Sequence, residues 1–548
     1  MSSAEISERT SRLAKASASY DARAWTDTFE AFFAADEIAP LGPSDLERYA
    51  TSAYMLGKVR EMLSIQERAH HAYLADGDTL GAARAALWLA TNLASRGKLP
   101  HASGWVEVSE RLLQSAPEDC VERGYLLMPQ MLRHATANEF DDVVDLGGRA
   151  ADIGRRFGDP DLTALAAQTQ ARALLRLSRT SEGLRLLDEV MISVTSSQLS
   201  PMVTGIVYCS VLEGCYETHA IKRAAVWTES LTDWCGEQPD LIAFNDQCLA
   251  HRSEILRLQG AWIEAVMEAQ RAGEAGARFQ IAAQALYQLG EIQRMRGDLA
   301  AAEQTYRQVS IDGADPMPGM ALLRLAKGNC DAAFTSSTDA LAEATDPFVR
   351  IQLLPAMVEI AVACAQIPTA TSAARELSEA AAATSTEAHL AWAAHAEGRV
   401  ALAEDRMAQA VVYLKKAKDR WQDLSMPYEL ARARVDLGRA LTARGDSDAA
   451  DLEYSAARTV FVELGAAPDV TVVDNLMRRA RSEWPGGLTD REAEVLRMLA
   501  SGATNRSIAA GLVLSERTVD RHVSNIFTKI DVSSRSAATA WAIRNGIG

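Results

Sequence analysis

Two arginines near the carboxyl end of the chain, Arg517 and Arg521, have a spacing that suits recognition of a DNA base. They are four residues apart, so a helix places both side chains on the same face. A guanidinium group can donate two hydrogen bonds to the acceptor atoms of guanine in the major groove. The polar groups on or beside this face that we expect to contact DNA are Thr518, Asp520, Ser524, Asn525 and Lys529.

An apolar stripe on the same segment indicates how this face would be positioned. Val519, Val523, Ile526 and Ile530 are spaced so that they lie along one edge of a helix, opposite the arginines. Ser515 precedes the segment and is a suitable helix cap. We therefore predict a helix to about residue 530 that docks by its apolar edge and presents arginine to a duplex.

A shorter helix is predicted just before it, from Asn505, with Thr504 as its cap. The hydroxyl groups and free amides at a helix start can hold a phosphate and set the register of the protein on DNA. Gly511 permits the turn between the two helices. The residues expected at the phosphate are Thr504, Asn505 and Ser507, and Arg506 is also expected to contact DNA.

Two further helices complete a small domain. Thr489 and Glu492 form a capping box at the start of the first helix, and Gly502 ends it. Ser533 or Ser534 caps the last helix, whose apolar side contains Ala537, Ala538, Trp541 and Ala542.

Asp520 has two open interpretations, because a carboxylate repels phosphate. It can accept a hydrogen bond from a cytosine amine, or it can pair with Arg517 three residues earlier, and we favour the pairing.

The charge balance changes sign at this domain. Residues 488–548 contain eight basic and six acidic residues, a net charge of +2, whereas the whole chain carries −17. Residues 1–487 therefore carry −19. An acidic body with a mildly basic tail indicates that only the tail meets a polyanion.

The tail resembles the LuxR-type helix-turn-helix family. The resemblance is ungapped and is carried by Leu488-Thr-Asp-Arg-Glu492, Gly502, Asn505, Ile508-Ala509, Leu514-Ser515, Thr518-Val519, His522-Val523, Asn525-Ile526, Lys529 and Arg535. It implies a four-helix DNA-binding domain over 488–548 with its helix-turn-helix unit at 505–524. It also implies dimerisation through the fourth helix, here Ala537, Ala538 and Trp541, on inverted half-sites.

The body of the chain predicts an all-α helical-repeat array. Apolar residues recur three and four apart, and turn-like sites follow at intervals of about 40 residues. These sites are Gly57, Gly97, Asn138, Thr180, Gly260, Gly297, Gly328, Asp405 and Gly445. The intervals 180–260 and 328–405 are close to double length.

Segments such as 283–306 and 431–454 resemble tetratricopeptide repeats, with small residues where paired helices meet. We expect a helical segment at 1–43, ten or eleven repeat pairs at 44–465, and a connecting helix and linker at 466–487. Such units stack into a superhelix with a long concave surface. Separate compact helical bundles are the alternative.

The sequence lacks the motifs that several kinds of chemistry require. The seven cysteines include no Cys-x-x-Cys pair, which favours free thiols in a reducing cytoplasm. The amino terminus has no apolar run typical of a signal peptide, and no segment is apolar enough to span a membrane. No phosphate-binding loop or hydrolase motif is present. We therefore expect no enzyme, cofactor or metal.

The architecture resembles the repeat and effector parts of large maltose-regulator-like activators without their ATPase. Our leading hypothesis is a cytoplasmic transcriptional regulator that binds double-stranded DNA as a homodimer. Its repeats would sense a protein, peptide or small-molecule ligand. The alternative is a protein-interaction scaffold or anti-regulator whose C-terminal domain serves mainly for dimerisation.

Overall fold

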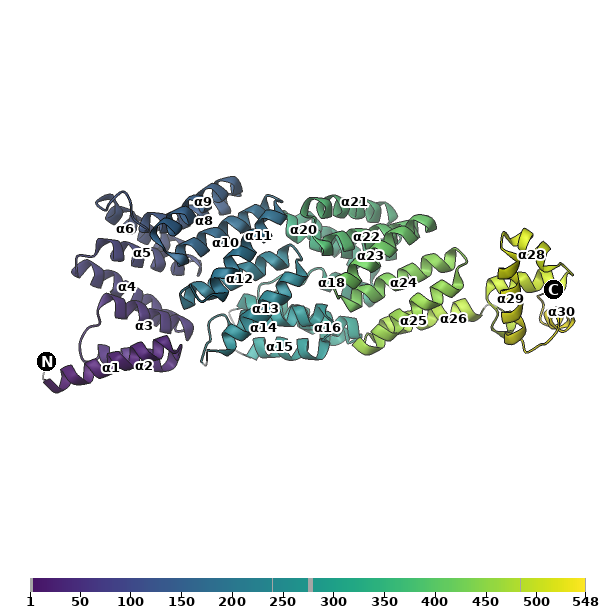
Figure 1. Ribbon diagram of the computed structural model, residues 1–548, viewed down its shortest axis with the longest axis horizontal. Helices are drawn as coiled ribbons and strands as arrows, with labels where there is room; N and C mark the ends of the chain where they lie inside the picture. Colours follow the sequence, from purple (N-terminus) through teal and green to yellow (C-terminus); the bar gives the residue numbers. More distant parts are fainter. Residues whose placement is uncertain (1–2, 239, 275–278, 483, 548) are drawn as a thin grey trace.

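The computed structural model describes residues 3–238, 240–274, 279–482 and 484–547, and these residues form helices and no strand. Figure 1 shows a long stack of antiparallel helices with a small separate domain beyond its carboxyl end. The predicted all-α architecture, a repeat array followed by a four-helix domain, is confirmed.

In the described residues the first half of the array contains α1 (Ser3–Asp21), α2 (Trp25–Asp36), α3 (Pro43–Met55), α4 (Val59–Ala75), α5 (Thr79–Ala94), α6 (Leu99–Gln114), α7 (Glu122–Tyr125), α8 (Leu127–Thr136), α9 (Phe140–Phe157), α10 (Pro160–Arg176), α11 (Thr180–Thr195), α12 (Pro201–Glu217) and α13 (Ile221–Gly236). The second half contains α14 (Asn245–Leu258), α15 (Trp262–Glu274), α16 (Phe279–Arg296), α17 (Leu299–Ile311), α18 (Gly319–Ala326), α19 (Cys330–Glu343), α20 (Pro347–Ala363), α21 (Ile367–Thr384), α22 (Glu387–Ala403), α23 (Met407–Asp423), α24 (Pro427–Ala443), α25 (Ser447–Leu464) and α26 (Ala467–Ser482). The C-terminal domain contains the 3₁₀ turn η1 (Pro485–Gly487), α27 (Asp490–Ala500), α28 (Asn505–Leu512), α29 (Glu516–Lys529) and α30 (Arg535–Arg544).

Left-handed turns separate the two helices of each pair at nearly all the predicted positions. Eight of the nine sites, all except Thr180, have a backbone φ between +59° and +94°. The exception is displaced by two residues, to Ser178, where φ is +59°. His219 and Ala365 supply the turns inside the two double-length intervals. The described elements between residues 44 and 465 therefore form eleven helix pairs, with α7 as a short additional helix.

Small residues let the paired helices approach closely, as the sequence predicts. A Cβ atom built on Gly438 of α24 would lie 2.5 Å from Cε1 of Tyr454 on α25. Gly290 of α16 meets Tyr306 of α17 in the same way, at 2.7 Å. Both tyrosines are almost fully buried, so each aromatic ring fills the space that its facing glycine leaves.

The array winds back on itself, which the sequence reading did not predict. Trp25 of α2 donates a hydrogen bond from Nε1 to Oε1 of Gln238, 3.2 Å away and 213 residues later. The backbone oxygen of Met55 accepts hydrogen bonds from the amides of Ile242 and Ala243, at 2.9 and 3.0 Å. Units far apart in the sequence are therefore in direct contact, in addition to the contacts between neighbouring units.

The connecting helix α26 packs as the last element of the array. Val473 is fully buried in a cluster with Trp262 and Phe461, and Pro468 lies against Gly297. The predicted connecting helix is thus present as α26 and packs with the repeats, and the linker follows it.

The prediction of free thiols is wrong for one pair of cysteines. Cys330, at the start of α19, forms a disulfide with Cys364, just after α20, with their Cα atoms 5.7 Å apart. These residues are 34 positions apart in the sequence and meet only because consecutive helices are antiparallel. Among the described residues the other five cysteines are not part of a disulfide.

A search of the described helices found none with the length and apolar character needed to cross a lipid bilayer.

Candidate nucleic-acid interface

The C-terminal domain has a hydrophobic core of its own. Twelve buried residues of this core come from 488–547, including Leu496, Ile508 and Ile526. The capping box of α27 is present: the amide of Thr489 donates to Oε2 of Glu492 at 2.8 Å, and the amide of Glu492 donates to Oγ1 of Thr489 at 3.2 Å. This small core is what fixes the orientation of the two helices described next.

Helix α29 docks by the predicted apolar edge. Val519 and Ile526 are fully buried, Ile530 is 7% exposed and Val523 is half-buried. On the opposite face, Arg517, Arg521, Ser524 and Asn525 are exposed. In the described part of the chain no ion pair involves Arg517 or Arg521, so two free guanidinium groups stand four residues apart on the outer face.

A hydrogen-bonded chain ties α28 to α29 and α30. Asn505, the first residue of α28, donates from Nδ2 to Oδ1 of Asp520 at 2.6 Å, and its Oδ1 accepts from Nη1 of Arg535 at 2.9 Å. Arg535 also donates to the backbone oxygen of Ala503. Asp520 therefore pairs with Asn505 and not with Arg517 as we favoured from the sequence. The carboxylate positions the two helices and leaves the arginine free.

The amino end of α28 presents polar groups beside α29. Thr504 accepts the amide of Ser507 at 3.2 Å, and both residues are exposed. The Arg506 side chain is 89% exposed, and its Nε lies 3.7 Å from Oε1 of Glu516. So long and exposed a contact contributes little, which leaves the guanidinium available to another anion. Thr518 bonds through its hydroxyl to Ser515 at 2.7 Å and is half-buried.

Two predicted contact residues are engaged inside the domain. Lys529 donates from Nζ to Oε2 of the buried Glu492 at 2.7 Å, so its charge neutralises the capping box. Ala538 of α30 is fully buried in the domain core, which corrects its predicted role in dimerisation because a partner could not reach it. Ala537 and Trp541 are half-buried, and Trp541 lies against Gly486 of the linker.

The exposed side of α30 contains an apolar residue that the sequence reading missed. Ile543 is 65% exposed, on the helix face turned away from Ala538 and Ala542. The periodicity of small apolar residues in this helix indicates only the side that faces the core. A single isoleucine on another side forms no repeating pattern, so the sequence does not mark that side as apolar.

His522 lies beside the core stripe of α29 and is half-buried. Burial lowers the pKa of its imidazole, and the carboxylates of Glu492 and Asp448 oppose that shift. The imidazole is therefore a neutral side chain packed beside the core at physiological pH.

Three arginines, Arg478, Arg479 and Arg481, lie close together in the sequence near the end of α26. Arg478 donates from Nη2 to Asn475 and is exposed, whereas the side chains of Arg479 and Arg481 lie outside the described residues.

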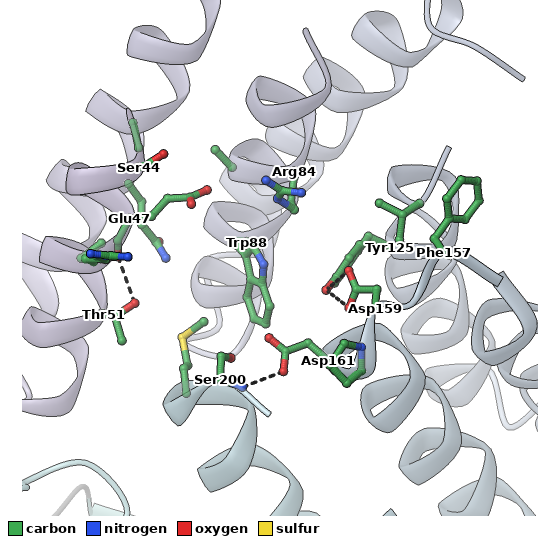
Figure 2. A pocket seen from close by; sticks show the side chains of 18 of the residues that line it. Ser44, Glu47, Thr51, Arg84, Trp88, Tyr125, Phe157, Asp159, Asp161 and Ser200 are labelled. Atoms are coloured by element: carbon green, nitrogen blue, oxygen red, sulfur yellow. Dashed lines mark hydrogen bonds between the residues drawn. The ribbon is translucent and has the colours of Figure 1, made fainter. Parts of the chain in front are cut away.

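The repeat array contains polar clusters that the function could use. One is a cavity of about 760 Å³ lined by residues between Tyr20 and Met202, among them Glu47, Arg84, Trp88, Tyr125 and Asp161. Figure 2 shows these side chains converging on the cavity from several helices. Asp161 accepts the amide of Ser200 at 2.8 Å, and Tyr125 donates to Asp159.

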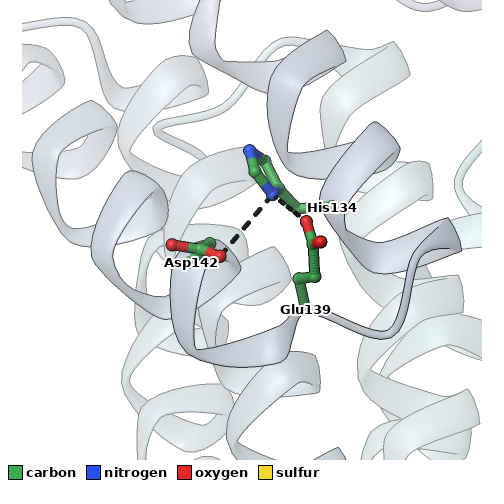
Figure 3. A group of neighbouring side chains, drawn as sticks. All are labelled: His134, Glu139 and Asp142. Carbon is green, nitrogen blue, oxygen red and sulfur yellow. Dashed lines mark hydrogen bonds and ion pairs between the residues drawn. The ribbon is translucent and has the colours of Figure 1, made fainter.

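A second cluster lies on the surface at the start of α9 (Figure 3). Nδ1 of His134 lies 2.6 Å from Oε2 of Glu139 and 3.7 Å from Oδ2 of Asp142, and both carboxylates are more than half exposed. This arrangement is an exposed ion-pair group at a helix start.

Comparison with known proteins finds similarity at the C-terminal domain. Residues 487–542 match the family described as bacterial regulatory proteins, luxR family. The chain is 48% identical over 59 residues to the transcriptional regulatory protein DegU of Brevibacillus brevis, covering 11% of this chain and 25% of that protein. It is 48% identical over 65 residues to the nitrate/nitrite response regulator protein homolog of Haemophilus influenzae, covering 12% of this chain and 31% of that protein.

The chain thus spans less than a third of the length of these two relatives. Among solved structures, the chain resembles one from the crystal structure of the APC/C hetero-tetramer Cut9-Hcn1, with a TM-score of 0.35 and 11% identity over 85% of this chain and 96% of that chain.

Proposed function

Because residues 487–542 form a helix-turn-helix domain of the LuxR type, we propose that the protein is a sequence-specific DNA-binding regulator of transcription. In this proposal the helical repeats sense a ligand and control the C-terminal domain. The observation that carries the proposal is the exposed face of α29, where Arg517 and Arg521 stand without an ion-pair partner among the described residues.

The geometry supports insertion of α29 into the major groove. A helix of this diameter fits the groove, and guanidinium groups on its outer face reach the edges of the bases. The start of α28, with Thr504, Arg506 and Ser507 exposed, is then the phosphate contact that sets the register. Asn505 and Asp520 hold the two helices at their mutual angle, because Oδ1 of Asp520 accepts a hydrogen bond from Asn505.

Recognition on inverted half-sites requires two copies of the domain. We assign the contact between copies to α30, where Ile543 is exposed; Ala537 and Trp541 lie on another side of this helix and are half-buried. An isolated apolar residue on a small charged domain is a suitable centre for a weak interface that forms only when both half-sites are occupied.

Control by the array needs two arrangements of the same chain. The C-terminal domain stands beyond α26 and connects through residues 484–487 (Figure 1). A ligand that binds the array better in one arrangement shifts the population toward it and thereby changes how often the domain is free to bind DNA. We expect such a regulator to act in the cytoplasm, because its DNA target lies there.

The decisive experiment is capture of genomic fragments by the full-length protein, followed by sequencing. We expect enrichment of a short two-fold symmetric motif. The matched control is the double variant Arg517→Ala and Arg521→Ala, which keeps the core of α29 and should lose the motif. If the wild-type protein captures no motif at low salt but retains a protein partner from the same cells, the chain is a protein-interaction scaffold and the proposal is wrong.

A further inference from the structure

A second cavity, of about 390 Å³, lies in the middle of the array. Its walls come from α12, α14 and α16, from the segment between α17 and α18, and from Gln352 of α20. A space of this size is within the range of small-molecule binding sites.

Three side chains that line this cavity contain buried polar atoms without a partner. His251 of α14 is 1% exposed, and neither of its ring nitrogens has a hydrogen-bond partner among the described residues. The same holds for Nδ1 of His219 and for Oε2 of Glu217. Buried polar groups are nearly always hydrogen-bonded, because an unpaired group loses its bonds to water and gains nothing in return. Four such atoms around one cavity indicate that something else completes their hydrogen bonds.

The side chains of His251 and Glu217 are held in place by contacts with neighbouring residues. The ring of His251 stacks on Tyr216, with centroids 4.6 Å apart and planes 9° from parallel. The phenol of Tyr216 donates to the backbone oxygen of His251 at 3.0 Å. Oε1 of Glu217 accepts from Arg172 and Arg176, at 2.8 and 2.9 Å, so only Oε2 remains for a ligand. A site whose side chains are fixed in advance loses little entropy on binding.

The charge of the lining favours a cation. Four carboxylates line the cavity, those of Glu213, Glu217, Glu254 and Asp315, and no lysine or arginine is among the lining residues that the structure describes. Burial lowers the pKa of His251 to about 3 and that of His219 to about 4, so both imidazoles are neutral at physiological pH. Burial also raises the pKa of Glu217 and Glu254, and the neighbouring arginines, Arg172 and Arg176 for Glu217 and Arg257 for Glu254, oppose that shift.

We propose that this cavity binds a small organic cation through its ammonium group. The N–H groups donate to Oε2 of Glu217 and to the acceptor nitrogen of His251, and the apolar part of the ligand lies along Tyr287 and Val309. An ammonium group fits because it offers several donors and a positive charge at once. The claim that this ligand regulates DNA binding rests on the proposed function. The claim that the cavity binds the ligand does not.

The larger cavity near the amino terminus does not carry the same inference. None of the polar side chains that line it contains a buried atom without a partner. Two arginines lie among its three carboxylates and offset most of their charge.

The test compares ligands that differ only in the charged group. The melting temperature of the full-length protein is measured with tyramine, with its alcohol analogue tyrosol and with its acid analogue 4-hydroxyphenylacetate. Butane-1,4-diamine and butane-1,4-diol form a second matched set. We expect at least one amine to raise the melting temperature at millimolar concentration while its neutral and acidic analogues do not. An equal or larger rise with an alcohol or the acid overturns the proposal, as does no rise with any amine.

Substitutions in the cavity test whether the amine binds there. Glu217→Gln and His251→Gln should each weaken amine binding. We expect each to raise the dissociation constant of the amine, measured by calorimetry, by about tenfold or more. Glu47→Gln is the matched control, because Glu47 is also a carboxyl group whose pKa burial raises but it lines the other cavity. If Glu217→Gln does not fold, Glu254→Gln takes its place. Full affinity in the cavity variants, or loss in Glu47→Gln alone, overturns the assignment.

Failure of this inference is distinguishable from failure of the proposed function. A protein that captures a DNA motif but binds no amine refutes only the cavity proposal. A protein that binds an amine but captures no motif refutes only the regulator proposal.

Discussion

Replacement of Arg521 by alanine separates the recognition of DNA sequence from the stability of the domain. The Arg521 side chain is exposed and has no ion-pair partner in the described part of the chain, so its removal should change the free energy of unfolding by less than about 0.5 kcal/mol. If the guanidinium donates two hydrogen bonds to a guanine, its loss costs about 1–3 kcal/mol of binding free energy at the matching site. That corresponds to roughly 5- to 150-fold weaker binding.

The assay is fluorescence anisotropy with a duplex that contains the captured motif and with a scrambled duplex of equal length. Arg521→Ala should weaken binding to the first duplex and change binding to the second much less. Arg506→Ala is the informative control, because a phosphate contact contributes equally to both duplexes. Its loss should reduce the slope of log affinity against log salt by about 1. Equal weakening on both duplexes by Arg521→Ala, or no weakening, refutes base recognition by this residue.

Four other changes test the remaining parts of the structure. Val519→Asp puts a charge into the core of the C-terminal domain and should abolish DNA binding, while circular dichroism of the full chain keeps most of its helical signal. Ile543→Asp should leave that domain folded but shift its complex with DNA from two copies to one, as seen by native mass spectrometry. Trp421→Ala removes a fully buried indole from the array and should cost about 3–5 kcal/mol in chemical denaturation. Stability should also fall as the pH drops below about 6.5, because burial, and secondarily His219, lower the pKa of His389 to about 2. Below this pH His389 is protonated in the unfolded chain but stays neutral in the folded chain, which lowers the free energy of unfolding. His389→Gln should therefore reduce the fall in the free energy of unfolding with falling pH. An unchanged slope contradicts the assignment.

The positions of most repeat turns could be predicted because their residues tolerate a left-handed backbone. Glycine, asparagine and aspartate supply eight of the nine marked turns. His219 and Ala365 also adopt positive φ, at +49° and +57°, but neither residue type favours that conformation. The packing of the flanking helices imposes the positive φ at both residues. A prediction based on residue preference therefore misses these two turns, and two intervals have double length.

The same distinction applies to the candidate DNA-binding face. Which edge of α29 is buried follows from the spacing of four apolar residues within one helix. The partners of its polar residues do not follow, because they come from other helices. Asp520 bonds to a residue 15 positions earlier, and Lys529 bonds to one 37 positions earlier. Sequence proximity favoured Arg517 as the partner of Asp520, but helix packing placed Asn505 closer.

The cavity in the middle of the array shows why its ligand site could not be found from the sequence. Its lining extends from Glu213 to Gln352, so no local motif spans it. Nothing in the local sequence distinguishes His251 from any other helix residue; its importance lies in two nitrogens that the surrounding helices enclose without pairing. A protein that kept these groups only for packing would be more stable with leucine or phenylalanine there. Retention of an unpaired imidazole and a half-paired carboxylate around one space is therefore better explained by a ligand that completes their hydrogen bonds, and His251→Phe supplies a direct check. It should stabilise the ligand-free protein and abolish amine binding together, whereas a gain in stability with amine binding intact would separate the histidine from the site.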